Sequence, residues 1–212
     1  MARYKNGING PLSGKVGPVV ATSWRGVKVL RAAPTATDEM TEGQRIQRLK
    51  FKLVAEWLRP LRDLIWLGFK LFTGSKTPMN GCVGYHLKHA VSVGGTDCQI
   101  DFPKAIFSRG ELVVSLIREL VSAAGALLNI KWDSALPSVL NSEDDEATFI
   151  VYSPKKKKFA TFSRVAKRAD GAIDLKLPAG FAGDEVHCYM QYVSADSSNV
   201  STTIYAGTVV IG

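Results

Sequence analysis

Cys82, His86 and His89 are the residues of this chain whose types and spacing come closest to a metal site. They fall at i, i+4 and i+7, so an α-helix would project all three from one face. Thiolate and imidazole groups are ligands of zinc and other transition metals. No fourth ligand is evident, although Asp97 or Cys98 could fold back to supply one. The sequence favours the alternative, an amphipathic helix with a buried cysteine and two interfacial histidines.

A glycine-rich stretch with a lysine invites comparison with a phosphate-binding loop, in which backbone N–H groups and a lysine cradle phosphates. The stretch from Gly10 to Gly14 is one residue too short for that pattern. Val16 stands where a serine or threonine would hold magnesium, and a hairpin rather than a helix is expected to follow. The sequence therefore favours a closely packed arm whose glycines permit unusual backbone dihedral angles.

Other catalytic patterns are missing from the sequence. Glu143, Asp144, Asp145 and Glu146 form an acidic run that could bind a hard cation, but the run lacks the glycine and alternating spacing of a calcium loop. A solvated loop before the next strand is favoured instead. There is no G-x-S-x-G, H-E-x-x-H or C-x-x-C motif, and His187 has no neighbouring nucleophile in sequence. We therefore predict a protein that is not an enzyme, with no cofactor and no small-molecule substrate.

Positive charge is concentrated in the first third of the chain. Residues 1–76 hold fourteen Lys and Arg against five Asp and Glu, a net charge of +9, whereas the remaining thirteen against fourteen give −1. An anionic partner should therefore meet the protein in this third. No nucleic-acid reader motif accompanies the charge, so such contact would be non-specific. The cations expected to make it are Arg3, Lys5, Lys28, Arg45, Arg48 and Lys52.

Length and composition indicate an ordinary globular protein. The 212 residues with 46% hydrophobic content are enough to bury a normal core. Three widely spaced cysteines argue against a disulfide framework and indicate a reducing compartment. The sequence does not begin with an apolar run of signal-peptide length, and no stretch reaches the roughly eighteen uncharged residues of a membrane span. We expect a protein that is cytoplasmic when synthesised.

These residues must be positioned by an α+β, mainly β fold in three parts. Residues 1–40 are expected to form a basic glycine-rich arm or β-hairpin with a turn at Arg25-Gly26. Residues 41–95 are expected to be helical. Apolar side chains recur there at three- and four-residue steps, as one face of a helix requires: Ile46, Leu49, Leu53, Trp57, Leu61, Leu64 and Ile65. Pro60 should kink this helix, and a shorter helix should cover Pro78 to Val91.

Residues 96–212 are expected to form an immunoglobulin-like β-sandwich, because strand-length segments alternate with turn signals at the spacing of that fold. Residues 111–128 also fit a helix, but their β-branched side chains favour strands. The run Lys155 to Lys158 is expected at a hairpin tip or charged edge, the alternative being a contact with phosphate, sugar or a neighbouring subunit. The expected strands are 98–107, 111–119, 125–132, 147–153, 158–165, 171–177, 185–194 and 199–211.

Several short motifs run through the whole chain. They are G-P-L-S-G-K-V-G from Gly10 to Gly17, W-R-G at Trp24 to Gly26, S-R-G-E-L at Ser108 to Leu112, I-K-W at Ile130 to Trp132, and D-E-V-H-C-Y at Asp184 to Tyr189. Together they resemble an uncharacterised family of Bacteroidetes proteins about as long as this chain. That family is a domain of unknown function, so the resemblance implies no activity, cofactor or catalytic residue. It does imply an N-terminal glycine motif, a helical middle and an immunoglobulin-like C-terminal part.

We hypothesise a non-enzymatic structural subunit whose N-terminal arm docks onto a neighbouring copy in a filament, shell or virion. Strand addition by an arm satisfies backbone groups at a neighbour's sheet edge and needs little side-chain specificity. The arm residues expected to take part are Gly14, Lys15, Gly17, Trp24, Arg25, Gly26 and Arg31. The alternative is a non-specific nucleic-acid or polyanion binder that uses the basic first third. An enzyme becomes a third hypothesis only if Cys82, His86 and His89 converge on a metal.

Overall fold

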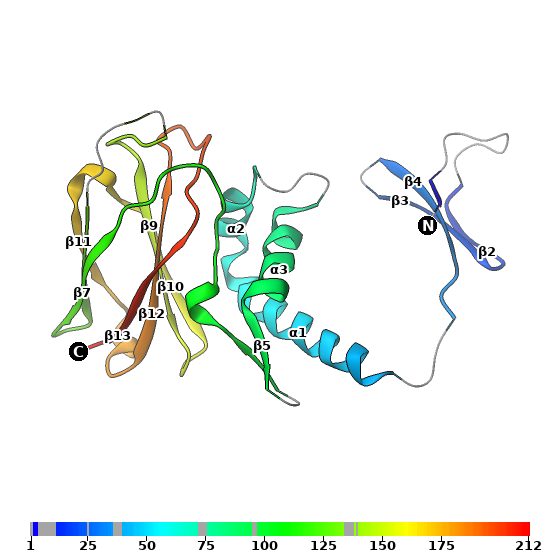
Figure 1. Ribbon diagram of the computed structural model, residues 1–212, viewed down its shortest axis with the longest axis horizontal. Coiled ribbons are helices and arrows are strands. Elements are labelled where there is room, and N and C mark those ends of the chain that lie inside the picture. Colours follow the sequence, from blue (N-terminus) through cyan, green and yellow to red (C-terminus); the bar gives the residue numbers. More distant parts are fainter. Residues whose placement is uncertain are drawn as a thin grey trace. The chain divides into compact units, whose positions relative to one another are not determined.

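The chain forms two compact units, Met1–Glu42 and Gly43–Gly212. The structure is a computed structural model, shown in Figure 1. It describes residues 2–3, 12–24, 26–35, 40–71, 76–94, 97–133, 138 and 140–212, with the backbone alone at 2–3. The fold is mainly β, as expected, with an N-terminal sheet, a kinked helical segment and a sandwich. No helix of the described residues is long and apolar enough to cross a membrane.

The first unit is a four-stranded antiparallel sheet. Its order is β1 (Ala2–Arg3), β4 (Val27–Ala32), β3 (Val19–Trp24) and β2 (Gly14–Val16). The expected hairpin is therefore confirmed as β3 and β4, and it is extended by one strand on each side. Gly17 and Pro18 alone connect β2 to β3, and Gly17 has φ +54°. Such two-residue turns need positive φ, which glycine adopts without steric strain.

The helical segment begins with α1 (Glu42–Leu58) and continues through a 3₁₀ turn, η1 (Arg59–Leu61), into α2 (Arg62–Gly68). Pro60 lies in that turn, so the predicted kink is confirmed. The shorter helix that was expected from Pro78 to Val91 is α3, which spans Pro78–His89. The Thr77 side chain caps it by accepting a hydrogen bond of 3.2 Å from the Asn80 backbone N–H.

Two antiparallel sheets form the predicted sandwich. The larger has the order β10 (Lys158–Lys167), β9 (Glu146–Ser153), β12 (Glu185–Val193) and β13 (Ile204–Val210), and the smaller has β11 (Ala172–Lys176), β8 (Leu127–Trp132) and β7 (Ile117–Ala123). Pairing the second strand of the sandwich with its fifth, and the third with its sixth, is the immunoglobulin-like arrangement. A separate ribbon pairs β5 (Val91–Gly94) with β6 (Asp97–Ile100). Short 3₁₀ helices are η2 (Phe102–Lys104), η3 (Arg168–Asp170) and η4 (Ala179–Phe181).

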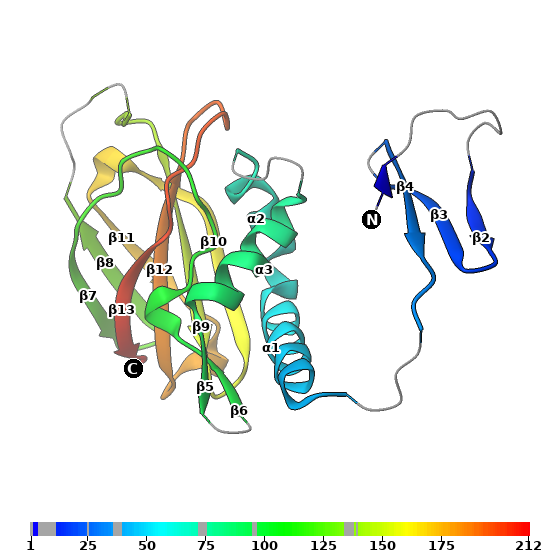
Figure 2. The ribbon, with the colours of Figure 1, turned by 45° about the vertical axis from the view of Figure 1, so that its right-hand side comes forward.

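The second unit has three layers and two hydrophobic cores. One core lies between the two sheets, and the other lies between the larger sheet and the helices, which cover that face in Figure 2. Successive residues of β9 alternate between the cores: Phe149 and Val151 belong to the first, Ile150 and Tyr152 to the second. The helical segment and the sandwich therefore fold against one another.

Three predicted strands differ from the observed ones. The strand expected at 98–107 ends at Ile100, and η2 follows, because Pro103 offers no backbone donor for a ladder. The strand expected at 111–119 is found at Ile117–Ala123, since the Val113 carbonyl accepts a hydrogen bond from Arg168 instead of from a strand. The strand expected from 199 begins at Ile204, and only isolated bridges precede it.

The buried face of α1 also differs from the prediction. Leu49, expected on that face, is exposed, whereas burial begins at Val54 and continues with Trp57 and Leu58. The first half of α1 has the apolar period of a buried helix but contributes no residue to either core.

Candidate functional site: the two faces of the N-terminal sheet

The N-terminal sheet leaves both of its faces largely exposed. Among its described side chains only Ala21 and Val29 are buried, whereas Val16 is 74% exposed and Trp24 is 53% exposed. Sheets in folded domains normally bury at least one face against another layer. This sheet therefore presents apolar surface that a partner can cover.

Strand register assigns each side chain to a face, because directly opposed residues in antiparallel strands project to the same side. Val16 opposes Val19, and Val19 opposes Ala32. Ala21 opposes Leu30 in the next row on that side. We call this side the apolar face and define it by Val16, Val19, Ala21, Leu30 and Ala32. Ser23 and Lys28 oppose each other and form the last row on this side, next to the turn at Gly26.

The opposite side carries cations and an aromatic ring. Val20 opposes Lys15 on β2 and Arg31 on β4, so the two cations lie in one row on either side of Val20. We call this side the basic face and define it by Lys15, Val20, Thr22, Trp24, Val27, Val29 and Arg31. Cations that displace counterions, together with aromatic side chains, suit a polyanion surface.

The residues predicted for the assembly arm thus divide by role. Gly14, Gly17 and Gly26 all have positive φ, at +108°, +54° and +78°, so they shape the backbone rather than meet a ligand. Lys15, Trp24 and Arg31 share the basic face. Arg25 lies outside the described residues.

The residues predicted to meet a polyanion are less concentrated than the sequence suggested. Lys28 lies on the side of the apolar face, Lys5 lies outside the described residues, and only the backbone of Arg3 is described. Arg45, Arg48 and Lys52 are exposed on α1. Their spacing of three and four residues places them in one row on the helix surface.

Cys82 and His86 meet in the helix core, but His89 does not join them. The Cys82 Sγ lies 3.6 Å from His86 Nδ1, which donates a 2.9 Å hydrogen bond to the Cys82 carbonyl. Burial raises the pKa of the Cys82 thiol and lowers the pKa of His86 to about 4. His89 is exposed, with its ring 4.8 Å from that of Tyr85. The described residues contain no group of three or more His, Cys, Asp or Glu that could hold a metal.

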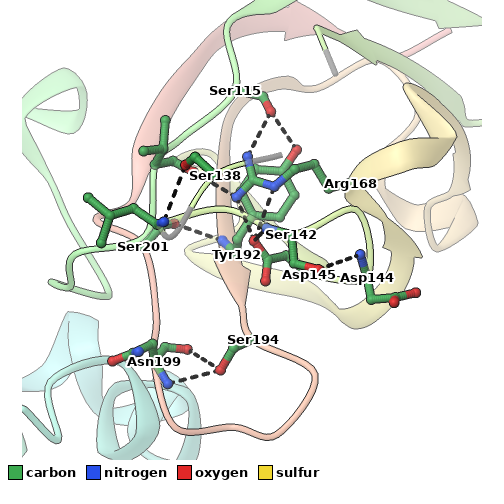
Figure 3. Close-up of polar contacts among 12 residues, drawn as sticks. Ser115, Ser138, Ser142, Asp144, Asp145, Arg168, Tyr192, Ser194, Asn199 and Ser201 are labelled. Atoms are coloured by element: carbon green, nitrogen blue, oxygen red, sulfur yellow. Dashed lines mark hydrogen bonds and ion pairs between the residues drawn. The ribbon is translucent and has the colours of Figure 1, made fainter. Parts of the chain in front are cut away.

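Asp145 corrects the interpretation of the acidic run as a solvated loop. Figure 3 shows its carboxylate facing the guanidinium of Arg168, and both side chains are buried. Arg168 Nη2 lies 3.0 Å from Asp145 Oδ2 and 2.7 Å from the Val113 carbonyl oxygen. The guanidinium lies over the Tyr192 ring at 3.8 Å, and the Tyr192 hydroxyl donates to Ser115 Oγ. This acid belongs to the structural framework rather than to a cation site.

The lysine run lies at the β9–β10 hairpin, as expected for a hairpin tip. Lys155 and Lys156 place their Nζ atoms 3.4 and 2.8 Å from the carboxylate of Asp184, which is itself buried. Asp184 is therefore the shared ion-pair partner of two of the four lysines. No pattern in the sequence connects these segments, because about thirty residues separate them.

A comparison of the sequence with known families finds a match over most of the chain. The family described as a family of unknown function (DUF6266) matches residues 11–207. The match takes in β2 to β4, the helices α1 to α3 and nearly the whole sandwich. A search of curated proteins finds no match.

Proposed function

From the premise that the chain belongs to the DUF6266 family, we propose that it is a non-enzymatic structural subunit. It assembles with copies of itself, as a homo-oligomer or larger assembly, through its N-terminal sheet. The observation that carries the proposal is a four-stranded sheet whose described side chains are all at least partly exposed except Ala21 and Val29. A single-layer sheet gains stability when a second layer covers its hydrophobic face.

The composition of the apolar face supports a protein partner. Val16 and Val19 lie side by side and are 74% and 41% exposed. Each buried aliphatic side chain contributes roughly 1.5–3 kcal/mol when it leaves water. Small alanines in the same rows allow another sheet to approach closely. This face is better suited to a second sheet than to a nucleic acid.

The edges of the sheet support strand addition as well. β2 forms one edge and has only three residues, and β1 pairs with only Val29 and Leu30 of β4. Exposed edges offer backbone donors and acceptors that another strand can satisfy. A partner can therefore extend the sheet while it covers the apolar face.

A pair of matched variants tests the proposal in the full chain. Val16→Glu with Val19→Glu adds two negative charges to the apolar face, and Thr22→Glu with Val27→Glu adds two to the basic face. Light scattering after size exclusion, with electron microscopy, should show assemblies for the wild type and the basic-face variant and monomers for the apolar-face variant. A monomeric wild type, or equal assembly by all three proteins, would contradict the proposal.

A second candidate function is non-specific binding of nucleic acid or another polyanion. Lys15 and Arg31 in one row, with Trp24 on the same face, favour it. Binding of a single-stranded oligonucleotide should weaken with salt, and each lost phosphate contact should reduce the slope of log K against log salt by about 0.7. Lys15→Gln with Arg31→Gln should lower affinity, whereas Val16→Glu, Val19→Glu should retain more of it. Binding that ignores salt would exclude this function.

The place of the protein in the cell is part of the same proposal. Synthesis in the cytoplasm followed by incorporation into a virion or another particle is consistent with a self-assembling subunit. The motif resemblance also supports an origin in Bacteroidetes. Fractionation of the source cells, with immunogold labelling of any particle, tests the localisation.

A further inference from the structure

A cavity of about 620 Å³ lies where α1, the β9–β10 hairpin and the segment around η2 meet. Trp57 lines it from α1, and Phe102 lines it from η2. Tyr152 and Phe159 line it from the two strands of the hairpin. All of its lining residues belong to the second unit. Segments that are distant in sequence therefore form one aromatic cavity, which no local pattern indicates.

The four aromatic rings form a packed cluster along the wall of the cavity. The centroid of the Trp57 ring lies 5.4 Å from that of Phe159 and 5.5 Å from that of Tyr152. The Tyr152 centroid lies 4.5 Å from that of Phe159 and 5.4 Å from that of Phe102. Aromatic pairs prefer separations of roughly 4.5–7 Å. Phe102 and Phe159 are only partly buried, so a further ring can extend the cluster on their exposed sides.

The size and lining of the cavity suit a small molecule. Sites for small molecules typically occupy roughly 300–1,000 Å³ and are lined mostly by apolar and aromatic groups, with a few polar groups that fix the orientation of the ligand. Here Leu53, Pro60 and Ile100 add to the apolar lining. The cavity therefore has room for a bicyclic aromatic ring with a short polar substituent.

Two groups of opposite charge line the same cavity from different elements. Glu56 belongs to α1, and Lys157 lies in the turn of the β9–β10 hairpin. Both residues are exposed, and neither takes part in an ion pair between described side chains. Lys155 and Lys156, in contrast, both face Asp184. A ligand that carries both an ammonium group and a carboxylate complements both charges of the cavity.

We propose that this cavity binds a free aromatic amino acid of the size of tryptophan. The ring of the ligand packs against Phe102 and Phe159, which continue the aromatic cluster. Its carboxylate faces Lys157, and its ammonium group faces Glu56. Aliphatic amino acids lack the ring and neutral aromatic compounds lack both charges, so neither class uses the whole lining. None of these residues belongs to the N-terminal sheet, so the site does not depend on the assembly proposal.

Four ligands that share the indole ring and differ in charge test the proposal in the full chain. Tryptophan carries both charges, tryptamine only the ammonium group, indole-3-propionate only the carboxylate, and indole neither. Titrations followed by amide NMR signals should show saturable binding of tryptophan, and the loss of each charge should weaken binding roughly fivefold, the upper value for an exposed ion pair. Absence of saturable binding of tryptophan at millimolar concentration would overturn the proposal. Equal affinity for indole would overturn it as well, because the cavity would then recognise only the ring.

Substitutions of the two charged groups should act on different ligands. Glu56→Gln should weaken tryptophan and tryptamine roughly fivefold and leave indole-3-propionate unchanged. Lys157→Asn should weaken tryptophan and indole-3-propionate to the same extent and leave tryptamine unchanged. Lys157 has φ +53°, a conformation that asparagine adopts more readily than lysine, so weaker binding would not reflect a strained turn. Lys158→Gln removes an equal charge outside the lining and should change none of the affinities.

Leu53 supplies a steric test that is independent of charge. It is half-buried and lines the cavity. Leu53→Trp should abolish binding of all the ligands by filling the cavity, whereas Leu53→Ala leaves the cavity open and should retain saturable binding. Circular dichroism checks that both variants are folded, and the charge variants decide independently if Leu53→Trp is not. Tryptophan binding that survives Leu53→Trp in a folded protein, or that is unchanged in both charge variants, would overturn the site.

Discussion

The N-terminal sheet and the larger sheet of the sandwich are both four-stranded and antiparallel, yet they differ in how they are covered. In the sandwich sheet, β9 is buried on both sides, with Phe149 and Ile150 in different cores. In the N-terminal sheet, Ala21 and Val29 are the only buried described side chains. The same secondary structure thus serves as the centre of one unit and as the exposed surface of the other.

Charges differ between the two regions in the same way. In the sandwich, Asp145 and Asp184 each face basic groups of the same unit, at 3.0 Å from Arg168 and 2.8 Å from Lys156. On the N-terminal sheet, Lys15 and Arg31 are exposed on a face that carries no acidic residue. An excess of charge in the sequence therefore indicates a partner only where the folded unit does not itself place an opposite charge beside it.

Removing the buried guanidinium should have the largest effect. Arg168→Met leaves the Asp145 carboxylate buried without its partner, and breaking such a pair destabilises a protein by about 3–5 kcal/mol. Urea unfolding followed by tryptophan fluorescence measures the loss. The double variant Arg168→Met, Asp145→Leu should recover part of it, because no unpaired charge remains. A loss below about 1 kcal/mol for Arg168→Met would show that this network does not distinguish the sandwich.

His86 should make the second unit sensitive to acid. Its pKa is about 4 in the folded protein because burial disfavours the charged ring, compared with 6.5 ordinarily. The unfolded chain therefore takes up the proton first, and stability decreases as pH falls from 6.5 towards 4, by about 3 kcal/mol. His86→Phe should lose less stability than the wild type across this range in urea unfolding at stepped pH. Parallel curves for the two proteins would refute the prediction.

A turn substitution should act on the N-terminal sheet alone. Gly17→Ala meets no steric clash but must adopt φ +54°, which is unfavourable for an L-residue by roughly 1–2 kcal/mol. Amide hydrogen exchange in β2 and β3 should accelerate about tenfold, which is the factor for 1.4 kcal/mol at equilibrium. Amides of β9 serve as the internal control and should not change. Faster exchange in both regions would mean that the sheet and the sandwich are not stabilised separately.

The smallest effect is expected at the exposed edge of the apolar face. Val16→Thr should change the free energy of unfolding of the monomer by less than about 0.5 kcal/mol, because the side chain is already 74% exposed. The same substitution at buried Val151 places a hydroxyl in the core and should destabilise by about 1–3 kcal/mol. Similar values at both positions, measured below the concentration for assembly, would remove the contrast between the sheets.

Local sequence patterns predicted the type of secondary structure correctly at several positions. Pro60 predicted the kink, and the apolar alternation of Val186, Cys188 and Met190 predicted a strand. That alternation did not reveal that Tyr189 packs in a second core, because a tyrosine fits both a solvated face and a helix-covered one. Period alone also placed Leu49 in the core, whereas its side chain is 43% exposed and belongs to neither core.

Sites formed by distant segments could not be predicted from the sequence. Asp145 looked like part of a solvated acidic run, since its partner Arg168 lies 23 residues away. Arg109 lies between two predicted strands, and its backbone N–H donates a hydrogen bond to the Gly68 carbonyl at the end of α2, a contact that no local pattern indicates. The N-terminal sheet differs, because Lys15 and Val16 are placed on opposite faces by pairing between β2 and β3, which are adjacent in sequence.

The two-residue connection at Gly17-Pro18 has a further consequence for how the chain can change over evolution. Side chains alternate with a period of two, so shifting β2 by one residue against β3 would bring Lys15 to the side of Val19 and turn Val16 away. Insertions of a single residue should therefore be tolerated only together with an exchange of the apolar and basic positions along β2. In relatives that keep the order of these positions, the connection between β2 and β3 should be longer by an even number of residues. The length of this connection therefore indicates which side of the sheet is under selection.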